Sequence, residues 1–415
     1  MLKRKKNIDI LLLLIVYLSI GQSTILYAQT NSLGQSSSST INTITTSVPF
    51  LMIAPDTRAG GLGDAGVASS PDENSVHWNA SKLAFIKKDM GLGISYAPWL
   101  RALVPDINLA YLSGYKKLGK PQTIAFSVLY FSLGTIQFTN TSGQVTGQFT
   151  PHEYAVDLAY SRKLSARFSG GTAIRYIYSN LTGGIYVGGT ESKPGQSVAA
   201  DISAYYQNDE LEIAKKKAIL SFGINISNIG AKMSYSASAE KDYIPINLRL
   251  GSGFQYEIDD YNSIMFIVDL NKLLVPTPPV YETDSAGNAV YNSVTGKQQV
   301  LLGKDPNVPI AQGMLQSFYD APYGWKEELH EITYSVGAEY WYDKQIGIRA
   351  GYFYEHATKG NRQFITLGAG VKYSVFGLDF AYLIPTTQRN PLENTLRFTL
   401  LFDFDALKAQ NSEKK

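Results

Sequence analysis

The sequence predicts an all-β fold, a transmembrane antiparallel β-barrel of about 14 strands with an N-terminal plug segment. Three observations lead to this prediction. The chain holds 28 Tyr, 18 Phe and 36 Gly, yet only 17% of its residues are charged. Beyond the N-terminus, no apolar run approaches the roughly 18 residues that a membrane-spanning helix needs. From Met90 onward, apolar side chains recur at every second position, the period of a strand that meets lipid on one face.

The first residues have the pattern of an export signal. Four basic residues precede an apolar run over residues 10–20, and a small residue, Ala28, follows. The run is shorter than the roughly 20 residues of a membrane span, so we expect a Sec signal peptide over residues 1–28, cleaved after Ala28. The alternative, an uncleaved anchor, is disfavoured by the polar residues 22–24. The chain has no cysteine, which excludes a lipidated cysteine, disulfides, thiolate metal sites and a cysteine nucleophile.

The charge balance argues against one class of partner. The formal net charge is +2, but four of the 37 basic residues and only one of the 35 acidic residues lie in residues 1–28. The rest of the chain therefore carries 33 basic and 34 acidic residues, a net charge of −1. Without a basic surplus, we expect no nucleic-acid partner.

Two stretches precede the first strand. Residues 29–47 are rich in Ser, Thr and Asn, a composition typical of a disordered segment. Residues 48–89 begin with an apolar stretch, pass through a glycine-dense turn and reach Ser70-Pro71-Asp72-Glu73. We expect a short helix to begin there, with Ser70 as its N-cap and Glu73 completing a capping box.

The alternating pattern marks 14 candidate strands, each near the 9–11 residues that a tilted membrane strand requires. Tyr154, Val156 and Leu158, for example, would share one face of their strand. We expect the barrel to occupy residues 90–404, followed by a periplasmic tail over residues 405–415. The candidate strands are residues 90–97, 107–116, 123–132, 153–162, 167–179, 198–206, 218–227, 246–258, 263–270, 332–342, 346–355, 364–373, 376–384 and 395–404.

The lengths of the connections decide between a membrane barrel and a soluble β-sandwich, which also alternates. After the even-numbered strands the connections are short, at residues 117–122, 163–166, 207–217, 259–262, 343–345 and 374–375. After most odd-numbered strands they are longer, at residues 133–152, 180–197, 228–245, 271–331, 356–363 and 385–394. Short turns on one side and long loops on the other are the outer-membrane arrangement. We therefore expect extracellular long loops and two periplasmic termini.

Charged residues at inward-facing strand positions indicate whether the lumen is filled or open. Their mixed signs favour pairing across a filled interior over the single-sign field of an ion-selective pore, although they would also hydrate the wall of an open channel. Residues 48–89 are the candidate to fill the lumen, with Asp56, Arg58 and Asp64 as their ionic contacts. The inward charges are Asp157, Arg175, Arg249, Glu257, Glu339, Arg349, Asp379 and Arg397.

The connection over residues 271–331 is exceptionally long, and loops of such length are functional or disordered. Its aromatic content indicates an ordered surface that packs against something. We expect it to hold partner-binding residues, above all Phe318, Tyr319, Tyr323 and Trp325. Its other aromatic residues are Tyr281 and Tyr291.

Motifs for enzymatic chemistry are missing from the sequence. The four histidines, His77, His152, His330 and His356, match neither a zinc-protease nor a hydrolase pattern, and there is no phosphate-binding loop. His330-Glu331 or Glu355-His356 beside a serine would be conceivable catalytic groups, but we interpret them as polar residues at strand ends. We expect no catalytic site, no metal and no cofactor.

A signature near the N-terminus resembles a known family. Its pieces are Pro55-Asp56-Thr57-Arg58, Gly60, Gly63-Asp64-Ala65-Gly66-Val67-Ala68, Ser70-Pro71-Asp72 and Trp78-Asn79, followed by Ser95-Tyr96-Ala97-Pro98-Trp99-Leu100. They are similar to the PorV family of the type IX secretion system, which is related to the 14-stranded FadL fatty-acid transporters. The resemblance extends over the chain beyond the signal peptide. One departure is Asn79-Ala80-Ser81, where the wider superfamily has Asn-Pro-Ala, which leaves the helix exit less fixed.

The resemblance implies a non-enzymatic carrier in the outer membrane. Such a protein would bind the C-terminal β-sandwich signal domain of secreted cargo as it leaves the translocon barrel, then pass it to the attachment complex with its PorU-type sortase. Outer-membrane lipid would surround it. The signature residues of the plug would be Pro55, Asp56, Arg58, Gly60, Gly63 and Asp64.

Two other functions compete with the carrier. A FadL-type channel for hydrophobic molecules such as long-chain fatty acids needs a continuous apolar path, which the mixed lumen charges oppose. A lipid-modifying enzyme needs a nucleophile and a base near the outer leaflet. Co-purification of a translocon barrel and of cargo with C-terminal β-domains would separate the carrier from both.

Overall fold

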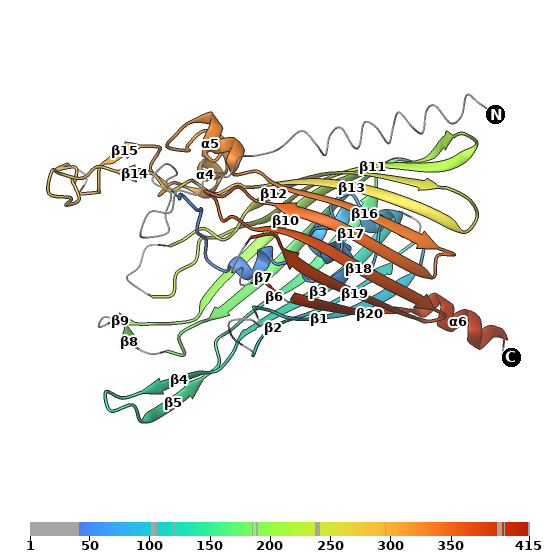
Figure 1. Cartoon of the computed structure of the whole chain (residues 1–415), viewed down its shortest axis with the longest axis horizontal. Coiled ribbons are helices and arrows are strands. Elements are labelled where there is room, and N and C mark those ends of the chain that lie inside the picture. Colours follow the sequence, from blue (N-terminus) through green and yellow to red (C-terminus); the bar gives the residue numbers. More distant parts are fainter. Residues whose placement is uncertain are drawn as a thin grey trace. The chain divides into compact units, whose positions relative to one another are not determined.

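A computed structural model of the chain contains one closed barrel of 14 antiparallel strands, which confirms the predicted fold class (Figure 1). The structure describes residues 41–413 apart from residues 101–103, 105, 120, 185, 188–189, 237–240, 295, 388–391 and 394. The predicted signal peptide and residues 29–40 lie outside the described part. The strands follow in sequence order around the ring, and β1 closes it by pairing with β20.

The strands agree with the predicted segments in number and order. They are β1 (Met90–Pro98), β2 (Ile107–Lys117), β3 (Gln122–Leu133), β6 (His152–Lys163), β7 (Phe168–Asn180), β10 (Gly195–Ile213), β11 (Lys216–Gly230), β12 (Asn247–Glu257), β13 (Asn262–Leu273), β16 (Thr333–Tyr342), β17 (Ile346–Tyr354), β18 (Gln363–Tyr373), β19 (Phe376–Pro385) and β20 (Thr395–Asp403).

Long loops gather at one end of the barrel and short turns at the other, as the sequence predicts (Figure 1). We call these the long-loop end and the short-turn end. The long loops contain three small ribbons and two helices. These are β4 (Ile136–Thr139) with β5 (Val145–Phe149), β8 (Tyr186–Val187) with β9 (Thr190–Glu191), β14 (Val280–Tyr281) with β15 (Val300–Leu302), α4 (Ile310–Gln316) and α5 (Trp325–His330).

The outer wall carries the side chains that lipid requires. Val156 and Leu158 of β6 point outward and are exposed, whereas their neighbours Glu153 and Asp157 are buried inside. Rings lie near both ends of the wall, for example Tyr154 and Tyr178, whose centroids are 5.0 Å apart. Aromatic girdles around an apolar band are typical of a membrane-spanning barrel. Towards the long-loop end lie Tyr130, Tyr154, Tyr176, Tyr178, Tyr334, Tyr352 and Tyr354, and towards the short-turn end lie Phe168, Tyr206, Phe222, Tyr261, Tyr342, Phe376 and Phe402.

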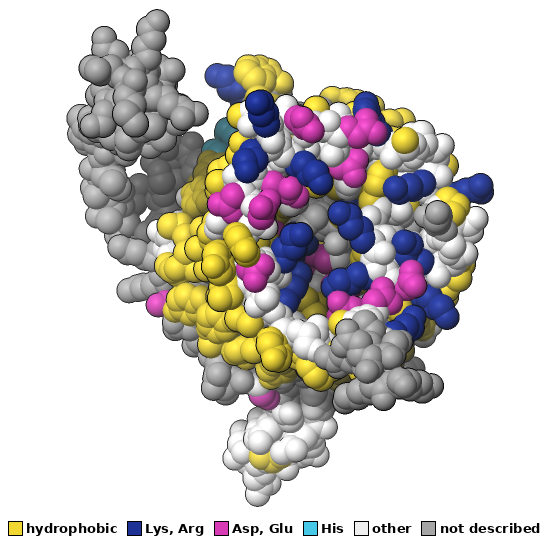
Figure 2. Space-filling view, turned by 90° about the vertical axis from the view of Figure 1, so that its right-hand side faces the viewer, with side chains coloured by type: hydrophobic (Ala, Val, Ile, Leu, Met, Phe, Trp, Pro, Cys, Tyr) yellow, Lys and Arg dark blue, Asp and Glu magenta, His cyan; other side chains and the backbone are white. Residues whose placement is uncertain are grey.

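Seen from the short-turn end, basic and acidic side chains cover the end of the barrel, and hydrophobic side chains cover its flank (Figure 2). The helix α6 (Phe404–Glu413) lies at this end, where the sequence analysis placed a periplasmic tail. No helix in the described part of the chain is long and apolar enough to cross a membrane.

Residues 48–86, which we call the lumen segment, lie within the ring of strands (Figure 1). They form η1 (Pro49–Met52), α2 (Thr57–Gly60), α3 (Ser75–Trp78) and η2 (Ala80–Phe85). Near the long-loop end, Phe50 stacks on Phe131, with ring centroids 6.3 Å apart. Near the short-turn end, the carbonyl of Leu83 accepts a hydrogen bond from the Thr123 hydroxyl at 3.0 Å. The segment therefore descends through the barrel from the long-loop end to the short-turn end.

Glycines allow the lumen segment to lie directly on the wall. Gly63, at φ +71°, faces Gly351 of β17, where an added Cβ would come within 2.1 Å of the Gly63 nitrogen. Because neither residue has a side chain, the two backbones approach closely without a clash.

Two local predictions about this part of the chain are wrong. The helix does not begin at Ser70, because α3 begins at Ser75 after an Asx turn in which Asp72 accepts from the Asn74 nitrogen at 3.1 Å. The chain also does not enter from the short-turn end. The Asn42 nitrogen donates to the carbonyl of Thr358, in a connection at the long-loop end, at 3.0 Å. Residues 42–47, assigned by composition to a disordered stretch, are thus held by hydrogen bonds.

Candidate functional site

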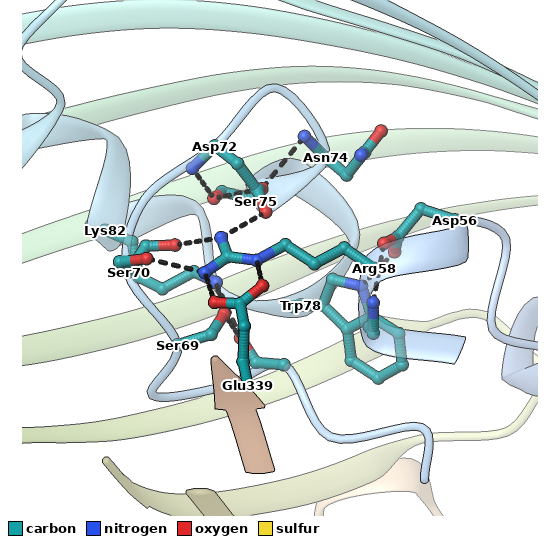
Figure 3. Close-up of polar contacts among 12 residues, drawn as sticks. Asp56, Arg58, Ser69, Ser70, Asp72, Asn74, Ser75, Trp78, Lys82 and Glu339 are labelled. Carbon is teal, nitrogen blue, oxygen red and sulfur yellow. Dashed lines mark hydrogen bonds and ion pairs between the residues drawn. The ribbon is translucent and has the colours of Figure 1, made fainter. Parts of the chain in front are cut away.

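Arg58 is the centre of a buried polar network in the lumen (Figure 3). Its guanidinium donates to both oxygens of Glu339 on β16, at 2.9 and 2.7 Å. The other three N–H groups donate to the Asp72 carboxylate at 2.9 Å and to the carbonyl and hydroxyl of Ser70 at 3.0 and 2.7 Å. All five donors are satisfied, which is the condition for a stable buried arginine. Ser70 is engaged by Arg58, which explains why it does not cap a helix.

The network continues into the barrel wall through pairs of opposite charge. Arg349 of β17 lies between Glu339 and Asp379, with both nitrogen–oxygen distances at 2.7 Å. Arg397 of β20 pairs with Asp64 of the lumen segment at 2.7 Å. The remaining pairs include Arg175–Asp157 at 2.6 Å and Arg175–Asp201 at 3.2 Å. The predicted pairing is therefore observed for most of the lumen charges, and it joins strands from several parts of the ring. Arg249 instead donates to the backbone carbonyl of His77 at 3.0 Å.

Asp56 has a different role from the predicted ionic contact with the wall. Its carboxylate accepts from the Ala59 nitrogen at 2.9 Å, so it caps α2, and from the Trp78 indole nitrogen at 2.6 Å. Both partners belong to the lumen segment itself. Asp56 thus fixes the internal fold of the segment, while Arg58 and Asp64 bind it to the barrel.

The other signature residues lie where the lumen segment meets the wall. Pro55 is buried. Gly60 lies under Arg397, and a Cβ at Gly60 would come within 2.2 Å of the Arg397 Nη1. A contact that the sequence analysis missed is Asp269 of β13, which accepts from the backbone nitrogens of Gly66 and Val67 at 2.7 and 2.8 Å. Its inward position on an alternating strand was the available signal.

A cavity of about 1110 Å³ opens at the long-loop end, above the lumen segment. Val48 and Phe50 contribute to its lining from below, and charged side chains of both signs, such as Glu355 and Arg362, also line it. Residues 43–50 also line it. We call this space the mouth cavity. The other aromatic and aliphatic residues around it include Trp99, Phe131, Leu133, Phe353, Phe364 and Leu392.

The predicted partner-binding residues gather on the segment that joins and includes α4 and α5. Trp325 is 69% exposed, and Phe318, Tyr319 and Tyr323 are each about half exposed. The structure adds Leu315, at 68%, and Leu329. Their spacing was a usable signal, because Leu315 precedes Phe318 by three residues and Leu329 follows Trp325 by four. We call these six residues the aromatic patch.

A buried ionic cluster, also missed from the sequence, holds α5 against the barrel. Lys272 pairs with Glu331 at 2.7 Å, and Lys359 pairs with Glu327 at 2.6 Å and with Glu331 at 2.9 Å. Burial by itself would raise the pKa of Glu327, but the hydrogen bond from Lys359 holds that pKa below its usual value. Glu327 in α5 and Glu331, the C-cap of α5, are four residues apart, a spacing that places both side chains on the same side, and this was the signal in the sequence.

Two of the histidines lie together at the edge of this cluster. The rings of His330 and His356 stack with centroids 3.5 Å apart, and His356 Nδ1 pairs with the Thr358 hydroxyl at 3.0 Å. Partial burial and the neighbouring His330 and Lys359 lower the pKa of His356. Among the residues that the structure describes, no three His, Asp or Glu side chains gather in a way that could hold a metal ion.

Several known proteins are similar to this chain. Solved structures with a similar course include the toluene transporters TodX of Pseudomonas putida (10% identity, TM-score 0.44, covering 87% of this chain and 98% of that one) and TbuX of Ralstonia pickettii (10%, 0.43, 84% and 97%). A FadL homologue of Pseudomonas aeruginosa is 11% identical, with a TM-score of 0.43, and the match covers 88% of this chain and 99% of that one. None of the curated proteins matches.

The family comparison is more informative than these distant structures. The family model described as type IX secretion system protein PorV matches residues 36–280, which is more than half of the chain. The match includes the whole lumen segment, Arg58 among its residues, and the strands from β1 to β13, whereas Glu339 of the Arg58 network lies beyond it. The chain therefore belongs to the PorV family of type IX secretion proteins, outer-membrane β-barrels.

Proposed function

We propose that this outer-membrane component of type IX secretion is a non-enzymatic carrier. It binds the C-terminal signal domain of secreted cargo at the long-loop end as the cargo leaves the translocon barrel. It then delivers the cargo to the surface attachment complex, which holds a PorU-type sortase. In this proposal the signal peptide is removed, the long loops face the outside, and the C-terminal helix faces the periplasm.

The observation that carries the proposal is the contrast between the two parts of the barrel. The lumen is occupied by residues tied to the wall through Arg58, Asp64 and Asp269. The long-loop end instead offers the mouth cavity and the aromatic patch. A filled interior beneath an exposed apolar surface favours binding of a macromolecule over conduction of small solutes.

The aromatic patch is the part of this surface that we assign to gripping. Exposed aromatic side chains supply much of the binding energy at protein interfaces, since they bury a large area at a low entropic cost. The salt bridges from Lys272 and Lys359 fix α5, so that Trp325 is presented on an ordered element. A preorganised surface loses less entropy when a partner binds.

The test is the double substitution Trp325→Ala with Phe318→Ala. Removal of two interface anchors should weaken binding of a purified cargo signal domain by roughly 2–4 kcal/mol, or ~30-fold or more in Kd. Calorimetry on the detergent-solubilised barrel would measure binding, and retention of cargo at the cell surface would measure function. Tyr291→Ala, at an equally exposed ring of the same loop outside α4 and α5, is the matched control and should change neither.

Heat-modifiable gel mobility separates a binding defect from a folding defect. The double variant should keep the mobility shift of a folded barrel, because both rings are solvent-exposed. Loss of the folded band would mean that the rings stabilise the mouth. Normal cargo binding and normal surface retention would exclude the patch as the gripping surface and direct attention to the loops over residues 133–152, 180–197 and 228–245.

A further inference from the structure

The chain enters the barrel at its long-loop end. Asn42 is bonded to two separate long loops. Its backbone nitrogen donates to the Thr358 carbonyl at 3.0 Å, and its side-chain nitrogen donates to the Pro278 carbonyl at 3.1 Å and to Glu327 Oε1 at 3.0 Å. Thr358 follows β17, whereas Pro278 and Glu327 lie between β13 and β16.

The next residues lead from these loops into the lumen. The Ser47 nitrogen donates to the Tyr243 carbonyl, in a third long-loop-end connection, at 2.9 Å. Val48 and Phe50 are then fully buried in a cluster with Tyr243 and Phe131. Residues 43–50 line the mouth cavity, so the entering chain forms part of the cavity wall.

The far end of the same stretch lies at the opposite end of the barrel. Thr57 meets Thr399, halfway along β20, at 3.0 Å. The Asp89 nitrogen donates to the Asp405 carboxylate in α6, beyond the last strand, at 2.6 Å. Residues 42–89 therefore cross the full depth of the barrel once, before the 14 strands cross it in turn.

We infer that residues 42–47 form a strap on the outer surface of the cell, from which the chain passes inward through the lumen to β1. The strap joins the connection after β13 and helix α5 to the loop after β17, and it closes one side of the mouth cavity. The inference rests on the orientation in the proposed function, in which the long loops face outward. It places the N-terminal end of the described chain on the opposite side of the membrane from α6.

A single-cysteine experiment tests this placement, since the natural chain has no cysteine. Thr45 is exposed on the strap, and Thr45→Cys should react with a membrane-impermeant maleimide on intact cells. Ser285→Cys, in the long loop, and Lys216→Cys, at a short turn, are the matched references, and both positions are exposed. We expect Thr45→Cys to label like Ser285→Cys, to within about twofold, while Lys216→Cys reacts only after permeabilisation.

The two references separate failure of this inference from failure of the proposed orientation. If Ser285→Cys reacts on intact cells and Thr45→Cys requires permeabilisation, the strap inference is wrong and the orientation stands. If Lys216→Cys reacts on intact cells and Ser285→Cys does not, the orientation itself is wrong. A Thr45→Cys that is unreactive even in detergent micelles would show a buried strap and would also overturn the inference.

A second variant tests the hydrogen bonds that hold the strap. Asn42→Ala removes both side-chain bonds and leaves the backbone bond to Thr358 in place. Ser47 is a buried residue of the strap, and two lost hydrogen bonds should raise the labelling rate of Ser47→Cys on the order of tenfold, because the strap opens more often. Thr46→Ala, a neighbouring change outside these bonds, is the control. An unchanged rate in Asn42→Ala would contradict a strap held at Asn42.

Discussion

Arg58 shows how one side chain can attach the lumen segment to the barrel. It reaches Glu339 on the wall, and Ser70 and Asp72 within the segment, with every N–H group in use (Figure 3). Arginine suits this position because its planar fork can serve two carboxylates at once. A buried ion pair is costly to break, because the partner left behind is an uncompensated buried charge.

Arg58→Met should therefore destabilise the folded protein by about 3–5 kcal/mol, the range for removing one partner of a buried pair. The change leaves Glu339 with Arg349 alone and removes the ionic partner of Asp72. The temperature at which the folded gel band disappears would measure the effect.

Arg167→Met is the matched control for Arg58→Met. Arg167 pairs with Glu210, but their side chains are 45% and 70% exposed, and exposed pairs contribute at most about 1 kcal/mol. Equal melting of the two variants would show that the Arg58 network adds little to the fold.

Sequence reasoning at the residue scale recovered inward-facing charges but not their partners. Asp157, Arg349 and Arg397 were assigned to the lumen because alternation fixes the face of a strand residue. The different roles of Asp56, which caps α2, and Arg58, which reaches β16, could not be predicted. Arg58 and Glu339 are 281 residues apart in the sequence and meet only in the folded barrel. Four of the six residues of the aromatic patch were predicted, Leu315 and Leu329 were not, and the role of the patch stays a prediction.

At the scale of elements, the β10–β11 hairpin shows where alternation fails as a guide. The residues after Tyr206 are mostly polar, a pattern that predicts a turn over residues 207–217. Pairing instead continues to Ile213 and Lys216, and the true turn is Ala214-Lys215, both with positive φ. Outside lipid both faces of a ribbon meet water, so a strand can continue without the apolar period.

The loop over residues 271–331 provides an element-scale prediction about pH. Burial, with the nearby Glu328 and Glu331, raises the pKa of Asp320 to about 6, from 3.8. Folded Asp320 therefore binds its proton more tightly than unfolded Asp320 does, and the local stability of the loop falls as pH rises from about 4 to about 6. Asp320→Asn should abolish this fall, giving more amide protection than wild type at pH ~8 and no difference at pH ~4.

Asp305, in the same loop, is the control, because its pKa is shifted in the opposite direction to that of Asp320. The hydrogen bond from the Asn307 nitrogen, at 2.8 Å, lowers the pKa of Asp305. Its contribution is present above the unfolded pKa and is lost as pH falls, so Asp305→Asn should reduce protection at pH ~8. Amide exchange should be compared between variants at the same pH. If Asp320→Asn and Asp305→Asn changed amide protection in the same direction at pH ~8, the opposite pKa shifts of the two carboxyls would be contradicted.

At the scale of the whole molecule, we predict a barrel that conducts poorly. The lumen segment contacts β3, β7, β13 and β20 at separate places around the ring, so a continuous water path through the barrel is not expected. In planar bilayers the intact protein should show little steady conductance, and deletion of residues 48–86 should raise it. Heat-modifiable mobility must confirm that the shortened chain still forms a barrel. A large, stable conductance in the intact protein would revive the channel for hydrophobic molecules.

The closure of β1 against β20 around the lumen segment constrains the order of assembly. Ring closure pairs Gly91 with Asp403, so it must wait for the last strand, whereas the segment inside is made first. Bonds such as Thr57 to Thr399 join residues 342 positions apart, and the entropic cost of such loops delays them. A chain held at its outer end by Asn42 would be hard to thread through a ring already shut. The insertion intermediate should therefore be an open, curved sheet whose inner face already binds the lumen segment. The hydrogen bonds between β1 and β20 should form only after that segment is in place.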